Sequence, residues 1–106
     1  MEGGADIDKA KDEDGCTPLY VASEFGHVEV VRALMEGGAD VDKAEDDGCT
    51  PLYIASQEGH VDVVRALVEG GADINKATND GSTPLQIATY NQHTEIIHLV
   101  ELAAQM

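Results

Sequence analysis

The chain has 106 residues, of which 42% are hydrophobic, and its 21 acidic and 6 basic residues give a formal net charge of −15 at pH 7. This length suits one compact domain, and the negative charge argues against nucleic acid or an anionic membrane surface as a partner, because both would be repelled. No apolar run approaches the roughly 18 residues of a membrane span, and the first residues lack the basic and apolar regions of a signal peptide, so we expect an intracellular, cytoplasmic protein.

A recurring pattern divides the chain into similar units. The segment Gly-x-Thr-Pro-Leu begins at Gly15, Gly48 and Gly81, at intervals of 33 residues, and residues 15–47 and 48–80 are identical at 24 of 33 positions. A fixed period of this size indicates stacked supersecondary units, each of which touches only its neighbours. We therefore predict a single domain over residues 1–106, composed of a leading hairpin remnant (1–14), two full repeats (15–47 and 48–80) and a C-terminal capping repeat (81–106).

The leading segment lacks helices of its own. Residues 1–10 match the end of a repeat whose helices are absent, which suggests the cut edge of a longer array and a first helix pair without a polar cap. The following loop spans ten positions from Asp6 to Gly15, whereas the two later loops span nine. We expect residues 11–14, at the tip of this loop, to bulge or to be mobile.

The repeat at 48–80 begins with a turn and a short helix. Asp46-Asp47-Gly48 is a turn signal, because Gly accepts the positive φ that such a turn requires. Thr50-Pro51 then opens a helix, with a hydroxyl at the cap and proline at the first helical position. Leu52, Ile54 and Ala55 are expected to face inward.

A second helix follows the break at Gly59-His60, where Gly supplies a left-handed residue. It is expected from about Val61 to Glu69, and its inward stripe consists of Val63, Val64, Leu67 and Val68. Gly70-Gly71 ends it, and Asp73-Ile74-Asn75 is predicted to be extended.

The last unit replaces apolar and glycine positions by other residues. Gln92 stands where the middle repeat has Gly59, Glu101 stands at the position of Val68, and Ala103-Ala104 replaces the Gly-Gly stop. Since a terminal repeat shows one face to water, we interpret this unit as a C-terminal cap and as the natural end of the protein.

The pattern Gly-x-Thr-Pro-Leu-x-x-Ala, followed by Gly-His-x-x-Val-Val-x-x-Leu-x-x-Gly-Gly-Ala-Asp-Ile-Asn, resembles the ankyrin repeat over essentially the whole chain. The resemblance implies an all-α, ankyrin-type solenoid of stacked helix-turn-helix repeats joined by extended β-hairpin-like loops. The chain departs from the family at the residue after Thr-Pro-Leu, where the usual His is replaced by Tyr20, Tyr53 and Gln86. The phenols and the amide are expected to replace the hydrogen bonds of that His or to form part of a surface.

The resemblance also implies where a partner would bind. In ankyrin-like arrays the partner lies along the concave surface, which is lined by hairpin tips and by the exposed side of the first helices. At the matching positions the candidate partner-binding residues are Glu13, Asp14, Cys16, Glu24, Phe25, Asp46, Asp47, Cys49, Gln57, Glu58, Asn79, Asp80, Ser82, Tyr90 and Asn91.

A further implication of the resemblance concerns Asn75. Leu67 together with Asp73-Ile74-Asn75 resembles the context in which ankyrin-like hairpins are hydroxylated on Asn by an oxygenase. Asp8 and Asp42 occupy the equivalent places in the other loops. The alternative for Asn75 is side-chain hydrogen bonding within its own hairpin.

No motif for catalysis, a cofactor or a metal is found in the sequence. The acidic loops do not fit the ligand spacing of an EF-hand, and His93 and His98 are five residues apart, unlike the four-residue spacing of a helical zinc site. Cys16 and Cys49 lie at equivalent repeat positions, where stacked layers are roughly 8–10 Å apart, so we predict that they do not form a disulfide.

Two functions remain open. The first is a non-catalytic, monomeric protein-binding module whose acidic concave face takes a partner with a basic or mixed basic and apolar surface. The second is a structural segment, or an engineered or truncated piece of a longer array, with no partner of its own. The same acidic charge would also be explained by solubility alone.

Overall fold

The computed structural model describes residues 7–10 and 15–105. The described residues form six helices and no strand: α1 Pro18–Glu24, α2 Val28–Glu36, α3 Pro51–Glu58, α4 Val61–Glu69, α5 Pro84–Tyr90 and α6 Thr94–Ala104. Each repeat contributes one helix pair, as the sequence predicted. The bulge expected at residues 11–14 lies outside the described residues.

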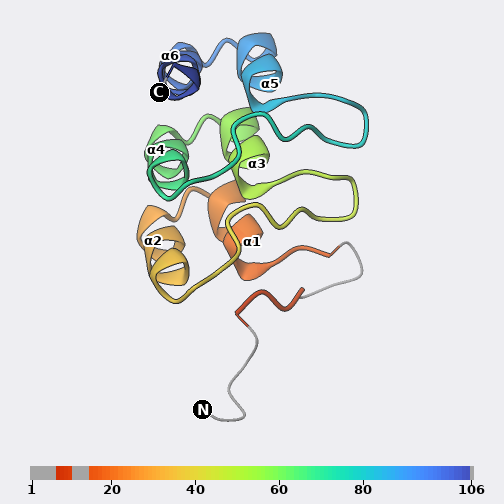
Figure 1. The fold of residues 1–106 in the computed structure, drawn as a ribbon, viewed down its shortest axis with the longest axis vertical. Helices are drawn as coiled ribbons and strands as arrows, with labels where there is room; N and C mark the ends of the chain where they lie inside the picture. The colour runs from red at the N-terminus through yellow and green to blue at the C-terminus, as the bar shows by residue number, and fades with distance from the viewer. Residues whose placement is uncertain (1–6, 11–14, 106) are drawn as a thin grey trace.

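The helices form two parallel layers. The first helices, α1, α3 and α5, contact one another in one layer, and the second helices, α2, α4 and α6, form the other (Figure 1). The loops that join one pair to the next project from the side of the first helices, on the right in Figure 1. This stack gives an elongated molecule of 42 × 26 × 22 Å.

Each first helix begins at a threonine cap. The hydroxyl oxygens of Thr17, Thr50 and Thr83 accept hydrogen bonds from the backbone N–H three residues later, at 3.1, 3.0 and 3.1 Å. Such a cap satisfies one of the N–H groups that a helix leaves without an internal partner. Gly59 ends α3 with a φ of 82°, the left-handed conformation that the sequence predicted.

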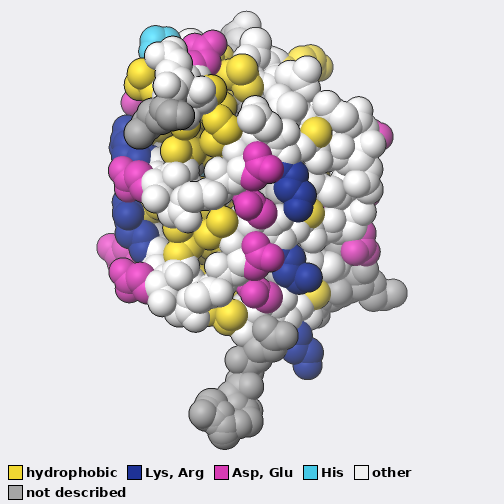
Figure 2. All heavy atoms as spheres, in the orientation of Figure 1, with side chains coloured by type: hydrophobic (Ala, Val, Ile, Leu, Met, Phe, Trp, Pro, Cys, Tyr) yellow, Lys and Arg dark blue, Asp and Glu magenta, His cyan; other side chains and the backbone are white. Residues whose placement is uncertain are grey.

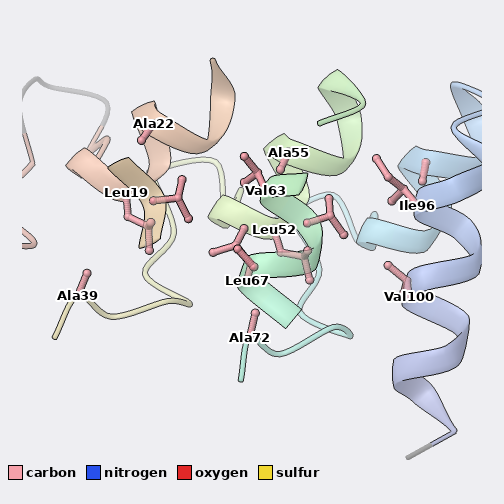
Figure 3. Packing of buried hydrophobic residues seen from close by; sticks show 14 residues of the cluster. Leu19, Ala22, Ala39, Leu52, Ala55, Val63, Leu67, Ala72, Ile96 and Val100 are labelled. Carbon is pink, nitrogen blue, oxygen red and sulfur yellow. The ribbon is translucent and has the colours of Figure 1, made fainter. Parts of the chain in front are cut away.

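The core lies between the two layers and is aliphatic. Figure 3 shows Leu19 of the first helix pair and Leu52 and Leu67 of the second pair pointing into it, and these side chains are 0–1% exposed. The inward stripe predicted for α4 is confirmed for its buried residues Val63, Val64 and Leu67, whereas Val68 is half-buried at the edge of the core.

The segment after α4 differs from the prediction of an extended chain. The carboxylate of Asp73 accepts a hydrogen bond from the Asn75 N–H at 2.9 Å, and the Asp73 carbonyl accepts one from Lys76 N–H at 3.4 Å. These bonds close a turn, because an Asp side chain can bond the backbone two residues on. The prediction of an extended Asp73-Ile74-Asn75 is therefore wrong in detail.

The last helix is longer than its counterparts because its stop signal is missing. α4 ends before Gly70-Gly71, and Gly71 has a φ of 94°. In the last unit Ala103-Ala104 occupies these positions, and α6 continues to Ala104. Alanine favours the helical conformation over glycine, so the helix extends. Along the described part of the chain, no helix is both long enough and apolar enough to cross a bilayer.

Candidate binding surface

The loop tips and first helices share one side of the molecule, which we call the tip surface. It consists of residues 45–49 and 78–82 together with α1, α3 and α5 (Figure 1). The two tips are hydrogen-bonded to each other: the Asn79 N–H donates to the Asp47 carbonyl at 2.9 Å, and the Asn79 side-chain amide donates to the Asp46 carbonyl at 3.0 Å. The tips of successive repeats therefore form one continuous surface.

Glu45 organises the tip of the second repeat. Its carboxylate accepts hydrogen bonds from the N–H groups of Asp47 at 2.7 Å and Cys49 at 3.1 Å. In the third repeat the Thr78 hydroxyl accepts one from Ser82 N–H at 3.2 Å. Sequence reasoning missed both residues, although an acceptor side chain three positions before the tip glycine was a usable signal. The carboxylate of Glu45 bonds the backbone of the tip, and the side chains of Asp46 and Asp47 are exposed.

Two histidines tie α4 and α6 to the repeat that precedes each of them. The Nε2 atom of His60 lies 3.0 Å from the Glu24 carbonyl, and that of His93 lies 3.0 Å from the Gln57 carbonyl. The Asn91 amide also donates to the Gln57 carbonyl, at 3.1 Å. These carbonyls lie at the ends of the preceding first helices, where carbonyl groups lack a partner within the helix. The histidines thus have a structural role.

The tyrosines of the tip surface differ in exposure. Tyr20 and Tyr53 are buried, and the Tyr53 hydroxyl lies 3.0 Å from the Ser82 hydroxyl. The Tyr53 phenol therefore joins two repeats. This agrees with the expectation that the residue after Thr-Pro-Leu replaces the hydrogen bonds of the usual His. Tyr90 and Phe25, in contrast, are 83% and 61% exposed at the ends of α5 and α1.

A shallow depression lies beside Tyr90. It is lined by Tyr90 and Ile87 on its apolar side and by Asp80, Ser82 and Gln86 on its polar side. Because an aromatic ring, an aliphatic side chain and a carboxylate meet there, the depression suits a side chain with an apolar stem and a positive end.

Burial raises the pKa of two titratable groups near the tips, Cys49 and Tyr20. Burial, together with the neighbouring Glu45 carboxylate, raises the pKa of the Cys49 thiol to about 11. Burial is also the main cause that raises the pKa of the Tyr20 phenol far above its usual range. A thiol with a raised pKa has little of the nucleophilic thiolate form at neutral pH.

Charge is unevenly distributed over the molecule. The basic residues are Lys9, Lys11, Arg32, Lys43, Arg65 and Lys76, and none lies within 15–27, 45–60 or 78–93. On α4 Arg65 pairs with Asp62 at 3.6 Å, and Figure 2 shows acidic side chains beside Lys and Arg over the second helices and the loops next to them. The tip segments 45–49 and 78–82 contain acidic residues but no Lys or Arg.

The structure describes all but two of the candidate partner-binding residues. Glu13 and Asp14 lie outside the described residues. The others belong to the tip surface, to the residues that end its helices, or to the loop just before α1. Those with exposed side chains are Phe25, Asp46, Asp47, Glu58, Asn79, Asp80 and Tyr90, and those that are half-buried are Cys16, Glu24, Cys49, Gln57, Ser82 and Asn91.

Not every candidate presents its side chain outward. The amides of Asn79 and Asn91 donate to backbone carbonyls of the preceding repeat, and the Ser82 hydroxyl meets Tyr53. Asn75 lies outside this surface, in the turn after α4, where its side chain is exposed. Across residues 7–10 and 15–105, no three His, Cys, Asp or Glu side chains are grouped so that they could hold a metal ion.

Comparisons with known proteins agree with this architecture. A family model described as ankyrin repeats (3 copies) matches residues 1–78 and, in an overlapping match, residues 37–105. Among curated proteins, the chain is similar to protein phosphatase 1 regulatory subunit 27 of Mus musculus, with 48% identity over 44 residues. This stretch is 42% of the chain and 28% of the mouse protein, so the similarity spans less than a third of that relative.

Proposed function

This chain belongs to the ankyrin repeat family, and on that premise we propose that it is a non-catalytic, monomeric and cytoplasmic protein-binding module. Its tip surface takes a basic, or mixed basic and apolar, segment of a partner protein. Ankyrin repeats generally mediate protein–protein interaction. The fold alone does not name the partner, because one fold serves many functions.

The observation that supports the basic partner is the separation of charge. The exposed carboxylates of Asp46, Asp47 and Asp80 lie in tips without Lys or Arg, and the second and third tips are hydrogen-bonded to each other. A partner with positive charge would be steered toward this surface, and its attachment would weaken as salt screens the charges.

Two exposed aromatic side chains support the apolar part of the proposal. Phe25 and Tyr90 lie at the ends of α1 and α5, and Tyr90 borders the depression that contains Asp80. Large aromatic side chains contribute strongly to binding when a partner covers them. The mouse relative is named a regulatory subunit of a phosphatase, which agrees with a role exerted on another protein.

The experiment compares two variants with the same change in charge. In the tip variant Asp46, Asp47 and Asp80 are replaced by Asn. In the control variant the exposed acidic residues Glu36, Asp62 and Glu69 of the second helices are replaced by their amides. Each protein is immobilised, and bound proteins are captured from a cell extract at low and at high salt and identified by mass spectrometry.

We expect the parent and the control variant to capture the same proteins at low salt and to lose them at high salt. The tip variant should lose them at both. Equal losses in the two variants would mean that only the total charge matters, and capture by the tip variant at the level of the parent would refute the assigned surface.

We also propose Asn75 as a site of hydroxylation by an oxygenase. Its side chain is exposed in a turn held by Asp73, so an enzyme could reach it. Mass spectrometry of the protein from cells should find one added oxygen on the peptide that contains Asn75 and none after Asn75→Ala. An unmodified peptide under oxygen-rich conditions would refute this role.

A further inference from the structure

The depression beside Tyr90 has an aromatic wall at a position where the other two units have none. Tyr90 lies in α5, three residues after Ile87, so the two side chains are neighbours on one face of the helix, and both line the depression. The residues at the position of Tyr90 in the second and first units are Gln57 and Glu24, which have no ring. The pairing of an aromatic ring with an aliphatic neighbour at these positions is therefore specific to the third unit.

The apolar floor of the depression is accessible. Gln86 stands where the second unit has Tyr53, which is 7% exposed, and Ile54, the counterpart of Ile87, is 5% exposed. In the third unit Gln86 is exposed and Ile87 is half-buried. The Gln86 oxygen accepts a hydrogen bond from Thr83 N–H at 2.9 Å, which holds this side chain at the start of α5. Part of the Ile87 side chain therefore remains open to a ligand.

The polar side of the depression carries one negative charge. Asp80 is the one acidic residue among those that line it, and its side chain is exposed. Two other polar groups are already engaged, because the Ser82 hydroxyl lies 3.0 Å from the Tyr53 hydroxyl and the Gln86 oxygen accepts a backbone N–H. No Lys or Arg lies within residues 78–93. The depression thus offers a carboxylate and an aromatic ring without a positive charge from its own segment.

We propose that this depression, which we call the Tyr90 site, binds one arginine side chain of the partner protein. The inference rests on the proposed function, since it names the residue that anchors a basic partner segment. The guanidinium stacks on the Tyr90 ring, its N–H groups meet the Asp80 carboxylate, and its methylene stem covers Ile87. Lysine fits less well, because its ammonium is a compact, strongly hydrated charge, whereas the planar guanidinium is weakly hydrated and stacks on aromatic faces. Tyr90 therefore sets a preference for arginine.

A second copy of this chain is a poorer occupant of the Tyr90 site. The two arginines of the chain, Arg32 and Arg65, belong to the second helices, and Arg65 pairs with Asp62 at 3.6 Å. Each copy also has a net charge of −15, so two copies repel each other. Charge complementarity favours an arginine from a different and more basic protein.

The test uses two short peptides with blocked ends, Gly-Gly-Arg-Gly-Gly and Gly-Gly-Lys-Gly-Gly, which have the same charge and differ only in the basic side chain. Each is titrated at low salt into the isotope-labelled full chain, and binding is followed by NMR through the backbone amides of residues 80–90. We expect the arginine peptide to bind about two- to five-fold more tightly, because stacking on the ring favours the guanidinium.

Variants of Tyr90 test whether the ring causes this preference. Tyr90 is 83% exposed, so its replacement leaves the core intact. Tyr90→Phe should keep the preference for arginine, whereas Tyr90→Leu, which retains apolar surface but has no aromatic face, should remove it. Asp80→Asn should weaken the binding of both peptides, and Glu69→Gln, which makes the same change in charge at the end of α4, should have a clearly smaller effect.

Four results would overturn the proposal: equal affinities for the two peptides, an arginine preference that survives Tyr90→Leu, equal effects of Asp80→Asn and Glu69→Gln, or a parent chain that sediments as a dimer and becomes monomeric after Tyr90→Leu. The first three would leave the function of binding a basic partner in place. An arginine preference that depends on Tyr90 and Asp80 supports the proposal. It would do so even if the tip variant captured the same proteins as the parent, a result that would refute only the proposed function.

Discussion

Leu67→Ala tests whether the fold depends on packing between repeats. Leu67 is fully buried at the centre of the middle helix pair, with helix pairs on both sides. The substitution removes three carbon atoms, and at about 0.8 kcal/mol for each buried methylene the loss of transfer free energy is about 2.4 kcal/mol. A residual cavity adds to this, so we expect a total of about 2–5 kcal/mol.

This loss would be a large part of the whole stability. Domains of this size unfold with about 5–15 kcal/mol, so Leu67→Ala should remove roughly a third. Since 1 kcal/mol shifts the thermal midpoint of a domain of this size by about 4–8 °C, the midpoint should fall by at least about 8 °C. Urea titration followed by circular dichroism gives the free energy directly.

Leu34 provides the matched comparison. It occupies the place of Leu67 in the first repeat, but it is half-buried because no described helix pair precedes α2. Leu34→Ala should therefore cost clearly less, about half as much if the cost follows the buried area. Gln57→Ala is the neutral control, expected within about 0.5 kcal/mol of the parent. Equal costs at Leu34 and Leu67, or a Leu67→Ala variant as stable as the parent, would refute the assignment of burial to repeat stacking.

Three smaller predictions concern the tips and helix caps. Because its pKa is raised to about 11, Cys49 should have roughly a hundred-fold less thiolate at neutral pH than an ordinary thiol. Labelling with a thiol-reactive reagent, followed by peptide mass spectrometry, should show a correspondingly slow reaction at Cys49 until the protein is unfolded. Gly81→Ala should lower the free energy of unfolding, measured by urea titration, by about 1 kcal/mol because of its φ of 86° alone. Gly48→Ala, also at 86°, should cost more, because the new Cβ would lie 2.7 Å from the backbone nitrogen of Asn79. Equal costs for the two variants would contradict this contact. Thr50→Ala should cost about 1 kcal/mol and Thr50→Ser much less, since only the first removes the hydroxyl that caps α3.

The helices were predictable because their limits are set by local chemistry. Thr50-Pro51 and Gly59 limit α3 as expected, since a cap, a proline ring and a left-handed glycine act over a few residues. The turn at Asp73 was missed. The Asp73 carboxylate accepts a hydrogen bond from the backbone N–H of Asn75, and a prediction made from the repeat period alone does not include such a bond, so it leaves the segment extended.

The candidate surface was predictable only in part. The positions of the tips followed from the repeat, and the exposed aromatic residues Phe25 and Tyr90 were found. The structural role of the Asn79 and Asn91 amides was not predicted, because their hydrogen bonds reach across to the preceding repeat. No local pattern distinguishes an amide that meets a neighbouring carbonyl from one that faces water.

The sequence alone determined the period and the limits of helices such as α3, because caps, prolines and stop glycines act over a few residues, and the 33-residue period indicated that the units stack. Only the tertiary structure decided which apolar positions are covered. Val30 and Val63 lie in nearly identical local sequences, yet one is half exposed and the other is buried. Burial is a property of a residue and its spatial neighbours together, and α4 has a helix pair on the side where α2 has none among the described residues.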